Sequence, residues 1–174
     1  ATDRPFLDPD GNGADQAVGP RILKVDTVAV ARAEAGGTLI TYSIPANTLK
    51  ATGKILRFTC WGSITNGTGF AELQFRLSSA SKHTVSVAAF ADAWRFVIYL
   101  IKTGSNTQDW FLDFTSSDTA GWDGAAVANL GDIRCMFGTA TETDTSAFNF
   151  DINISLAQSG ETITQEGLLV ELLN

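Results

Sequence analysis

One ten-residue stretch, AFNFDINISL at 147–156, constrains the fold of this chain more than any other feature. Apolar and polar side chains alternate strictly along it. The apolar side holds Phe148, Phe150, Ile152, Ile154 and Leu156, and the polar side holds Asn149, Asp151, Asn153 and Ser155. A period of two is typical of a β-strand, because successive side chains point to opposite faces of a sheet. The stretch therefore predicts a strand with one buried face and one face in water.

Shorter stretches repeat this alternation, each with an apolar set predicted to face inward. These sets are Ile40, Tyr42 and Ile44 in 38–44; Leu56, Phe58 and Cys60 in 55–62; Ala71, Leu73, Phe75 and Leu77 in 71–77; and Trp110, Leu112 and Phe114 in 108–114. Weaker strands are predicted at 22–30, 83–89, 131–137 and 162–172. A short helix is the alternative for the last segment, ITQEGLLVELL, where Gly167 and the run LLVELL favour a strand. In 22–30 the phase slips between Val25 and Val28, which indicates a bulge.

Residues 94–101, WRFVIYLI, are apolar on both faces. This favours a central strand, or a strand covered by a second layer or by a partner chain. With turn residues between the runs, about nine or ten short strands predict an all-β, two-sheet antiparallel sandwich. Composition does not separate a jelly roll from an immunoglobulin-like sandwich.

The first 20 residues differ from the rest of the chain. They hold three of the four prolines and show neither a helical nor a strand period. We therefore predict an extended N-terminal arm at 1–20 and a single β-sandwich domain at 21–174.

The charge balance bears on the partners of the chain. There are 12 Lys and Arg residues against 19 Asp and Glu, a net charge of -7. A surface of this sign repels phosphate backbones, so no nucleic-acid partner is expected. No apolar run approaches the ~20 residues of a membrane span, and the N-terminus lacks a signal pattern. We expect a protein that is made and kept in a cytoplasm, with no membrane partner.

The sequence offers little for catalysis, and we expect no enzyme. His83 is the only histidine; it lies at a predicted strand start, away from any nucleophile elbow, and is expected on an edge or surface. One histidine without clustered thiols also excludes a typical zinc site.

Carboxylates beside aromatic residues are the remaining catalytic candidates. Asp109 and Asp113 flank Phe111 on one strand face, and Asp118 and Asp123 surround Trp122. Paired carboxylates suit glycoside hydrolysis, but an acidic β-protein also presents such pairs by chance. A non-catalytic glycan-binding patch at Trp122 is a further alternative.

The arm contains the sharpest local motif, Asp8-Pro9-Asp10-Gly11-Asn12-Gly13-Ala14-Asp15. It matches the opening of a calcium loop, with oxygen ligands at alternate positions and a glycine at the bend. The twelfth position is Gly19 instead of glutamate, so Asp15 would have to supply the missing oxygen. Asp8, Asp10, Asn12 and Asp15 are thus a candidate calcium site, and a plain turn is the alternative. No other cofactor is expected.

Trp61 and the two cysteines lie in predicted strands. Trp61 falls opposite Leu56, Phe58 and Cys60, so it is expected on an outer face, either as a partner-binding anchor or half-buried under a loop. Cys60 and Cys135 are expected to be buried reduced thiols, although a bridge between neighbouring strands is an open alternative.

The segment Ser43-Ile44-Pro45-Ala46-Asn47-Thr48-Leu49, followed by Gly53 and ILRFTCWG (55–62), resembles a family of small tailed-bacteriophage virion proteins. In that family a similar segment leads through a glycine turn into a strand ending in Trp-Gly. Here WRFVIYLIKTGSNTQDW and a closing GLLVELL follow. The resemblance covers roughly residues 38–172. It implies a jelly-roll-like sandwich, often trimeric, on the outside of a phage particle.

The resemblance leads to a specific expectation of function. We expect a capsid decoration, or cement, protein that binds the major capsid protein on the virion exterior as a homotrimer. Phe6 and Leu7 of the arm and Trp61 are the residues expected to contact partners. The alternative is a tail or fibre module that binds a host receptor or carbohydrate.

Overall fold

The computed structural model describes residues 20–33, 37–65, 70–88, 91–118, 133–156 and 162–173. These residues form β-strands joined by turns and contain no helix, so none of them forms a helix able to span a membrane. The strands are β1 (Arg21–Asp26), β2 (Val30–Arg32), β3 (Thr38–Ile44), β4 (Ile55–Thr65), β5 (Phe70–Leu77), β6 (Ala80–Ala88), β7 (Ala91–Gly104), β8 (Thr107–Asp118), β9 (Ile133–Ala140), β10 (Phe148–Leu156) and β11 (Thr162–Leu173).

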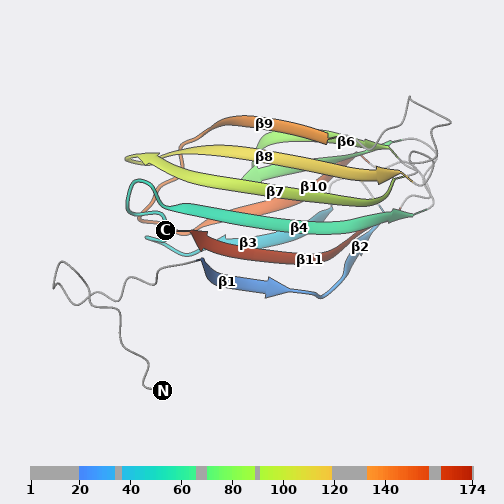
Figure 1. The fold of residues 1–174 in the computed structure, drawn as a ribbon, viewed down its shortest axis with the longest axis horizontal. Coiled ribbons are helices and arrows are strands. Elements are labelled where there is room, and N and C mark those ends of the chain that lie inside the picture. The colour runs from blue at the N-terminus through green and yellow to red at the C-terminus, as the bar shows by residue number, and fades with distance from the viewer. Residues whose placement is uncertain are drawn as a thin grey trace, which may run out of the picture.

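Two antiparallel sheets lie face to face, as the sequence predicts (Figure 1). The larger sheet has the order β1-β11-β4-β7-β8-β9, with β2 also paired to β11. The smaller sheet has the order β3-β10-β5-β6. Strand β7 lies between β4 and β8, which confirms the central position predicted for 94–101.

The pairing order is that of a jelly roll. With β2, β8 and β9 set aside, the remaining strands pair first with last and then inward: β1 with β11, β3 with β10, β4 with β7, and β5 with β6. This nested pairing is a long hairpin rolled into two sheets, the arrangement of a double-sheet jelly roll. The hairpin of β8 and β9 is added to it and extends the larger sheet beyond β7.

The predicted inward sets form the core between the sheets. Each described member is buried except Tyr42, which is half-buried and packs edge-on against Phe58. The two sheets meet where Phe58 of β4 stacks on Phe150 of β10, with ring centroids 4.1 Å apart and planes 7° from parallel. Phe75 of β5 meets Trp110 of β8 edge-on at 5.6 Å. Aromatic contacts of this kind add to the burial of apolar area.

Two side chains predicted to lie in water are buried instead. Asp151 and Asn153 are 9% and 7% exposed. They lie on β10, an inner strand of the smaller sheet between β3 and β5. Thr41 Oγ1 donates a hydrogen bond to Asp151 Oδ1 at 2.9 Å, so the buried carboxylate has a partner on the neighbouring strand.

The stretch 22–30 forms parts of two strands instead of one. The irregularity in β1 lies between Ile22 and Lys24, and not between Val25 and Val28 as predicted. The side chain of Asp26 explains where β1 ends: its Oδ1 accepts the N–H of Val28 at 3.0 Å, a local turn that competes with strand pairing.

The connection at 45–54, which carries the segment of phage resemblance, is a tight, well-bonded turn. Asn47 has a φ of 65°, a backbone conformation that asparagine tolerates better than most residues. Its N–H donates to the carbonyl oxygen of Asp144 at 2.8 Å, and Leu49 is 1% exposed. The segment therefore places one leucine in the core and joins the loop between β9 and β10.

A group of polar side chains, all buried except Asn106, closes the same end of the sandwich. We call Lys102, Asn106, Gln108, Glu142 and Asp144 the polar cluster. Lys102 Nζ pairs with Asp144, and the Gln108 amide donates to Asp144 Oδ1 and to the Glu142 carbonyl oxygen, both at 2.9 Å. Asn106 N–H donates to Asp144 Oδ2 at 3.0 Å. The polar cluster thus joins the turn between β7 and β8 to the loop between β9 and β10.

Candidate functional site

Most of the predicted site residues lie outside the described part of the chain. These are Phe6, Leu7, Asp8, Asp10, Asn12, Asp15, Trp122 and Asp123. Trp61 is described, and its surroundings are the candidate site.

Trp61 lies on the outer face of the larger sheet, as its phase in β4 predicts. Its inward neighbours along the strand are fully buried, whereas Trp61 is half-buried. It stands directly opposite Gly167 of β11, and a Cβ added to Gly167 would lie 2.1 Å from Trp61 Cζ2. The indole therefore lies over the bare backbone of β11, so a glycine on the next strand, and not a loop, accounts for part of its burial.

A bulge in β11 places a carboxylate beside this indole. The register between β4 and β11 shifts between Gln165 and Gly167, so Glu166 is the extra residue. Ser63 Oγ donates a hydrogen bond to Glu166 Oε1 at 2.7 Å. Bulges often turn a side chain toward a functional surface.

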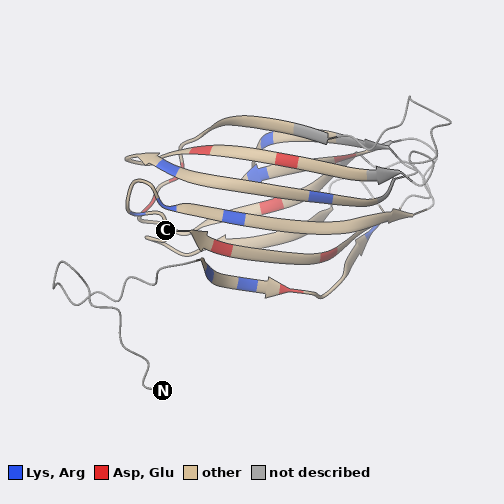
Figure 2. Cartoon of the chain, viewed as in Figure 1, with Lys and Arg blue, Asp and Glu red and all other residues tan. Residues whose placement is uncertain are grey.

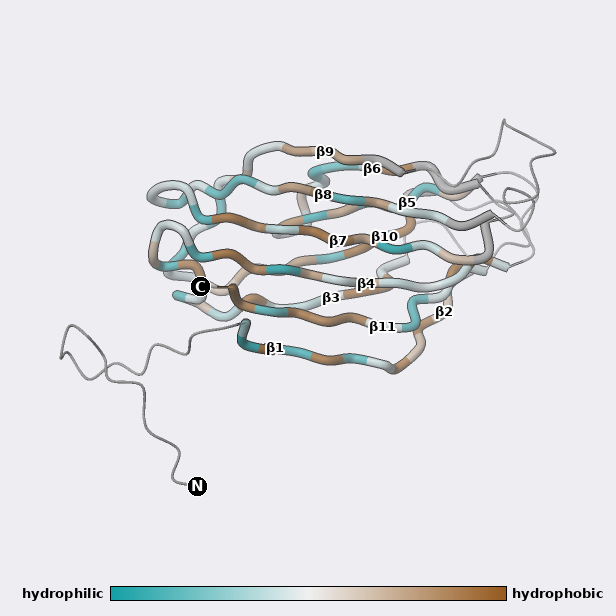
Figure 3. The backbone as a smooth tube through the Cα atoms, in the orientation of Figure 1, coloured by the Kyte–Doolittle hydropathy of each residue, from teal (hydrophilic) through white to brown (hydrophobic). Residues whose placement is uncertain are grey.

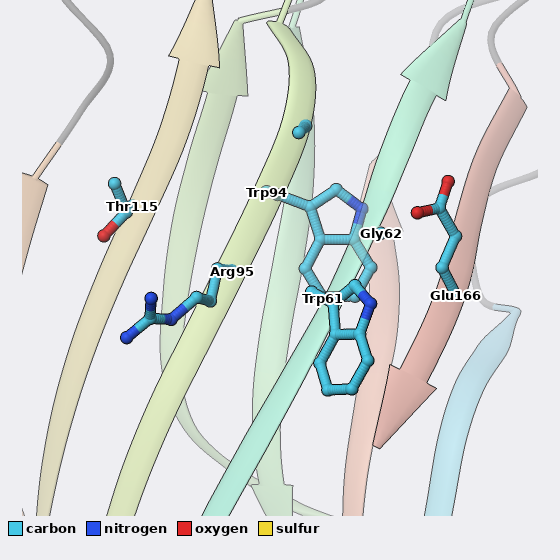
Figure 4. A pocket seen from close by; sticks show the side chains of 7 residues that line it. Trp61, Gly62, Trp94, Arg95, Thr115 and Glu166 are labelled. Carbon is cyan, nitrogen blue, oxygen red and sulfur yellow. The ribbon is translucent and has the colours of Figure 1, made fainter. Parts of the chain in front are cut away.

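The outer face is hollowed next to Trp61 (Figure 4). The hollow has a volume of about 260 Å³ and is lined by Trp61, Gly62, Ala93, Trp94, Arg95, Thr115 and Glu166. The Trp94 indole N–H is buried and has no acceptor among the described residues. Arg95 is exposed on one side of Trp61, and Glu166 is exposed on the other. An aromatic ring between a guanidinium and a carboxylate can bind a partner.

Two exposed aromatic residues on this face were not predicted as a site. Phe111 of β8 and Phe137 of β9 are opposite one another in the ladder and are 38% and 85% exposed. Tyr99 of β7 continues the row, with its ring 6.3 Å from that of Phe111. The sequence signal for Phe111 was its position between Asp109 and Asp113 on the face predicted to be wet, since an apolar residue among outward polar ones marks a contact surface.

An ion pair lies in the same row. Arg57 of β4 and Glu171 of β11 are ladder partners, and Arg57 Nε donates to Glu171 Oε2 at 2.7 Å. The hydrogen bond to Glu171 raises the pKa of Arg57. Arg57 and Glu171 therefore neutralise each other's charge in the middle of the outer face.

The two cysteines differ in exposure. Cys60 is buried in the core, where burial raises the pKa of its thiol, while Cys135 is exposed on the outer side of β9. The prediction that both thiols are buried is wrong for Cys135. A bridge between them is excluded, because β7 and β8 separate β4 from β9. Alternation did not predict that Cys60 is buried and Cys135 exposed. The exposure of Cys135 depends on the position of β9 at the edge of the larger sheet, which is not a local property.

The catalytic candidates do not come together. His83 lies half-buried on β6, an edge strand of the smaller sheet, with its ring 6.2 Å from that of Trp110. Asp109 and Asp113 lie on β8 of the larger sheet. Within the described ranges, no three His, Cys, Asp or Glu residues are grouped so as to hold a metal ion.

The chain therefore forms an all-β, two-sheet sandwich with jelly-roll pairing, and the outer face of its larger sheet has a hollow and exposed aromatic side chains. No protein-family model matches the sequence, and no curated protein matches it. Among solved structures, the chain is similar to the CBM2 module of the evolved Dit protein of Lactobacillus casei BL23 phage J-1. The TM-score is 0.36 and the identity 13%, with 75% of this chain and 67% of that one covered.

Two further similar structures come from infectious bursal disease virus. The Gx strain structure has a TM-score of 0.26 and 13% identity, with 88% of this chain and 42% of that one covered. The VP2 subviral particle has a TM-score of 0.28 and 12% identity, with 98% of this chain and 46% of that one covered. The chain thus spans less than half the length of these two. All three TM-scores lie below 0.5, so these likenesses identify neither a family nor a function.

Proposed function

We propose that this chain is a virion structural protein that decorates the outside of an assembled phage shell as a homotrimer. The observation that carries the proposal is the hollow at Trp61 on the outer face of the larger sheet. Trp61 and Arg95 belong to the residue types that dominate protein–protein contacts. The phage resemblance supports the same reading, with the major capsid protein as the partner.

Binding would stabilise the shell by mass action. A ligand that binds only the assembled lattice stabilises it by about 2.7 kcal/mol per site at a hundred times its dissociation constant. Full burial of a large apolar side chain adds about 1.5–3 kcal/mol to a contact. A half-exposed tryptophan on a sheet thus contributes part of the binding free energy, and little conformational entropy is lost because the strand is already ordered.

The proposal is tested by co-sedimentation of the purified chain with undecorated shells. We expect Trp61→Ala to weaken shell binding by at least tenfold. Asn149→Ala is the matched control, because Asn149 is exposed on the smaller sheet, away from the hollow. Equal binding by Trp61→Ala and the wild type would refute the role of the hollow.

The arm is tested in the same assay. Removal of residues 1–20, which carry Phe6 and Leu7, is expected to weaken attachment while circular dichroism and thermal unfolding of the sandwich stay unchanged. Undiminished binding by the truncated chain would remove the arm from the proposal. A calorimetric titration with Ca²⁺ tests the motif at Asp8, Asp10, Asn12 and Asp15, and absence of heat would leave it as a turn.

Copy number separates the shell from the tail. Quantitative mass spectrometry of purified particles is expected to give a count in the hundreds, as a lattice protein requires. A handful of copies would place the chain on the tail or a unique vertex.

The second candidate is a tail or fibre module that binds a host receptor or carbohydrate. The arrangement of Trp61, Arg95 and Glu166 around one hollow favours it, because an aromatic ring with flanking polar groups also suits a sugar. It predicts glycan-array binding that Trp61→Ala abolishes, or that requires Trp122. An array without hits would exclude carbohydrate as the ligand.

A further inference from the structure

Figure 3 shows β1 and β9 at two opposite margins of the larger sheet. The exposed large apolar side chains lie on or next to these two strands. Among the described residues, Ile22, Val25 and Val28 lie on or just after β1 and are 60%, 57% and 71% exposed. Phe111 and Phe137 lie on β8 and β9. We call these groups the β1 margin and the β9 margin. Each margin exposes large apolar side chains to water, which is typical of a contact surface without its partner.

The two margins carry charge of opposite sign (Figure 2). β1 contains Arg21 and Lys24 against Asp26, which is two basic residues minus one acidic, or +1. Among the described side chains of β8 and β9 are Asp109 and Asp113 and no basic residue, which gives -2. Opposite potentials attract one another across an interface, and like potentials repel.

Among the described strands, β9 also presents a backbone edge without a further neighbour. β9 is the last strand of the larger sheet, contains no proline, and pairs with β8 without a register shift. The edge strands of the smaller sheet, β3 and β6, each have a register shift against their neighbours. Because bulges blunt an edge against further pairing, β9 is the regular edge that remains available.

We propose that the β1 margin of one copy of this chain docks on the β9 margin of a second copy. A second copy is the fitting occupant, because the chain itself supplies both the cationic apolar margin and the anionic apolar margin. Pairing of two β9 margins would instead bring together two margins that both carry acidic residues on β8. The interface joins two different patches, so it is heterologous and repeats from copy to copy until a ring closes. The inference deepens the proposed function, since it specifies how the homotrimer would assemble.

Two complementary variants test the arrangement in isolated protein. Val25→Asp disables the β1 margin, and Phe137→Asp disables the β9 margin; both side chains are exposed, so the fold should persist and circular dichroism checks it. In sedimentation velocity at tens of micromolar, we expect wild-type oligomers and each variant alone as a monomer. An equimolar mixture should form dimers and nothing larger, because only one intact interface can form. Asn149→Asp, on the smaller sheet, should assemble like the wild type.

A native thiol provides the second test. Cys135 is exposed on β9 within the β9 margin, and Val25 is exposed on β1. Under mild oxidation, Val25→Cys is expected to form disulfide-linked oligomers that Cys135→Ser abolishes, while wild type and Ser43→Cys stay unlinked. Wild-type dimers linked through Cys135 would overturn the head-to-tail arrangement, and a monomeric wild type would overturn self-association. Because no shell is present, failure here leaves the shell-binding assay to decide the proposed function separately.

Discussion

At the scale of single residues, the described tryptophans share one arrangement. Trp61, Trp94 and Trp110 each stand opposite a glycine in the ladder: Gly167, Gly62 and Gly138. In each case a Cβ on the glycine would lie within 3 Å of the indole ring. Because the glycine has no side chain, the indole can lie directly against the backbone of the neighbouring strand.

These glycines should not tolerate alanine. We expect Gly62→Ala to be the most destabilising, because its Cβ would lie 1.8 Å from the Thr164 carbonyl oxygen, which belongs to the backbone and moves little. Gly138→Ala meets the buried Trp110 and should cost about 1–3 kcal/mol. Gly167→Ala should cost less, since the half-buried Trp61 can rotate away. Urea unfolding measures all three.

Gly104→Ala is the matched control for this series. Its added Cβ would lie 3.7 Å from the nearest atom, Thr107 Cβ, which is an ordinary contact. Its free energy of unfolding should stay within about 0.5 kcal/mol of the wild type. Equal losses at Gly104 and Gly138 would show that the fit to tryptophan is not what requires glycine.

The thiols provide a second prediction at this scale. The native monomer should react with one equivalent of a disulfide reagent through Cys135, because Cys60 is buried and its raised pKa keeps it a thiol. In denaturant two equivalents should react. Two fast equivalents in the native protein would contradict the burial of Cys60.

Only part of this residue-level picture is predictable from the chain. Trp61 and Gly62 are neighbours in sequence, but the glycine beneath Trp61 is Gly167, far along the chain. Such a contact depends on strand register, which alternation does not specify. The inward sets were predictable because each requires only local spacing.

At the scale of elements, the polar cluster holds together segments that the sheets alone leave separate. Lys102 is 2% exposed, and its ammonium is paired with Asp144. Burial lowers the pKa of Lys102. A buried charge of this kind is tolerated only with its partner in place.

Asp144→Ala should therefore destabilise the fold by about 3 kcal/mol, because it leaves the Lys102 charge buried without its carboxylate. Lys24→Ala, which breaks the exposed pair with Asp26, should cost at most about 1 kcal/mol. Both are measured by thermal and denaturant unfolding. Similar losses in the two variants would contradict a special role for the buried pair.

The pH dependence of Asp144→Ala has a definite sign. A lysine with a lowered folded-state pKa binds fewer protons when folded than when unfolded, between that pKa and the ordinary value of 10.5. The free-energy cost of burying the Lys102 charge is fully present below the folded-state pKa. This cost is relieved as the pH rises toward 10.5. The difference in unfolding free energy between the variant and the wild type should shrink over that window.

Elements were predicted better than their irregularities. Alternation located most strands because it is a local property, and Gly167 with the run LLVELL correctly favoured a strand over a helix at β11. The bulge at Glu166, which shapes the candidate site, has no local signal, since it exists only in the pairing of β11 with β4. The irregularity in β1 was also misplaced, because it depends on the pairing of β1 with β11 and has no local signal.

At the scale of the whole molecule, nested pairing makes most contacts distant in sequence. The first strand pairs with the last, and the chain must bring its ends together before the larger sheet is complete. Topologies dominated by distant pairing fold slowly, in about milliseconds to seconds. We expect stopped-flow tryptophan fluorescence to show refolding at this rate or slower. Refolding within microseconds would contradict the nested order.

The sandwich was predictable from the number and spacing of strands, but the pairing order was not. Composition does not distinguish a jelly roll from an immunoglobulin-like sandwich, because both folds bury one face of alternating strands between two sheets. The phage resemblance favoured the jelly roll, and the observed order agrees with it. Of the predicted site, Trp61 alone lies within the described ranges, and its hollow required the three-dimensional neighbours of the tryptophan.

The pairing of β1 with β11 also determines how the molecule would respond to mechanical force. Arg21, at the start of β1, is opposite Leu172, near the end of β11, so both strands reach the same end of the sandwich (Figure 1). Tension between these two points would peel the ladder apart one pair at a time, instead of shearing all its hydrogen bonds together. The domain should therefore open at low force when pulled by its ends, and resist a load that enters across the broad faces of its sheets.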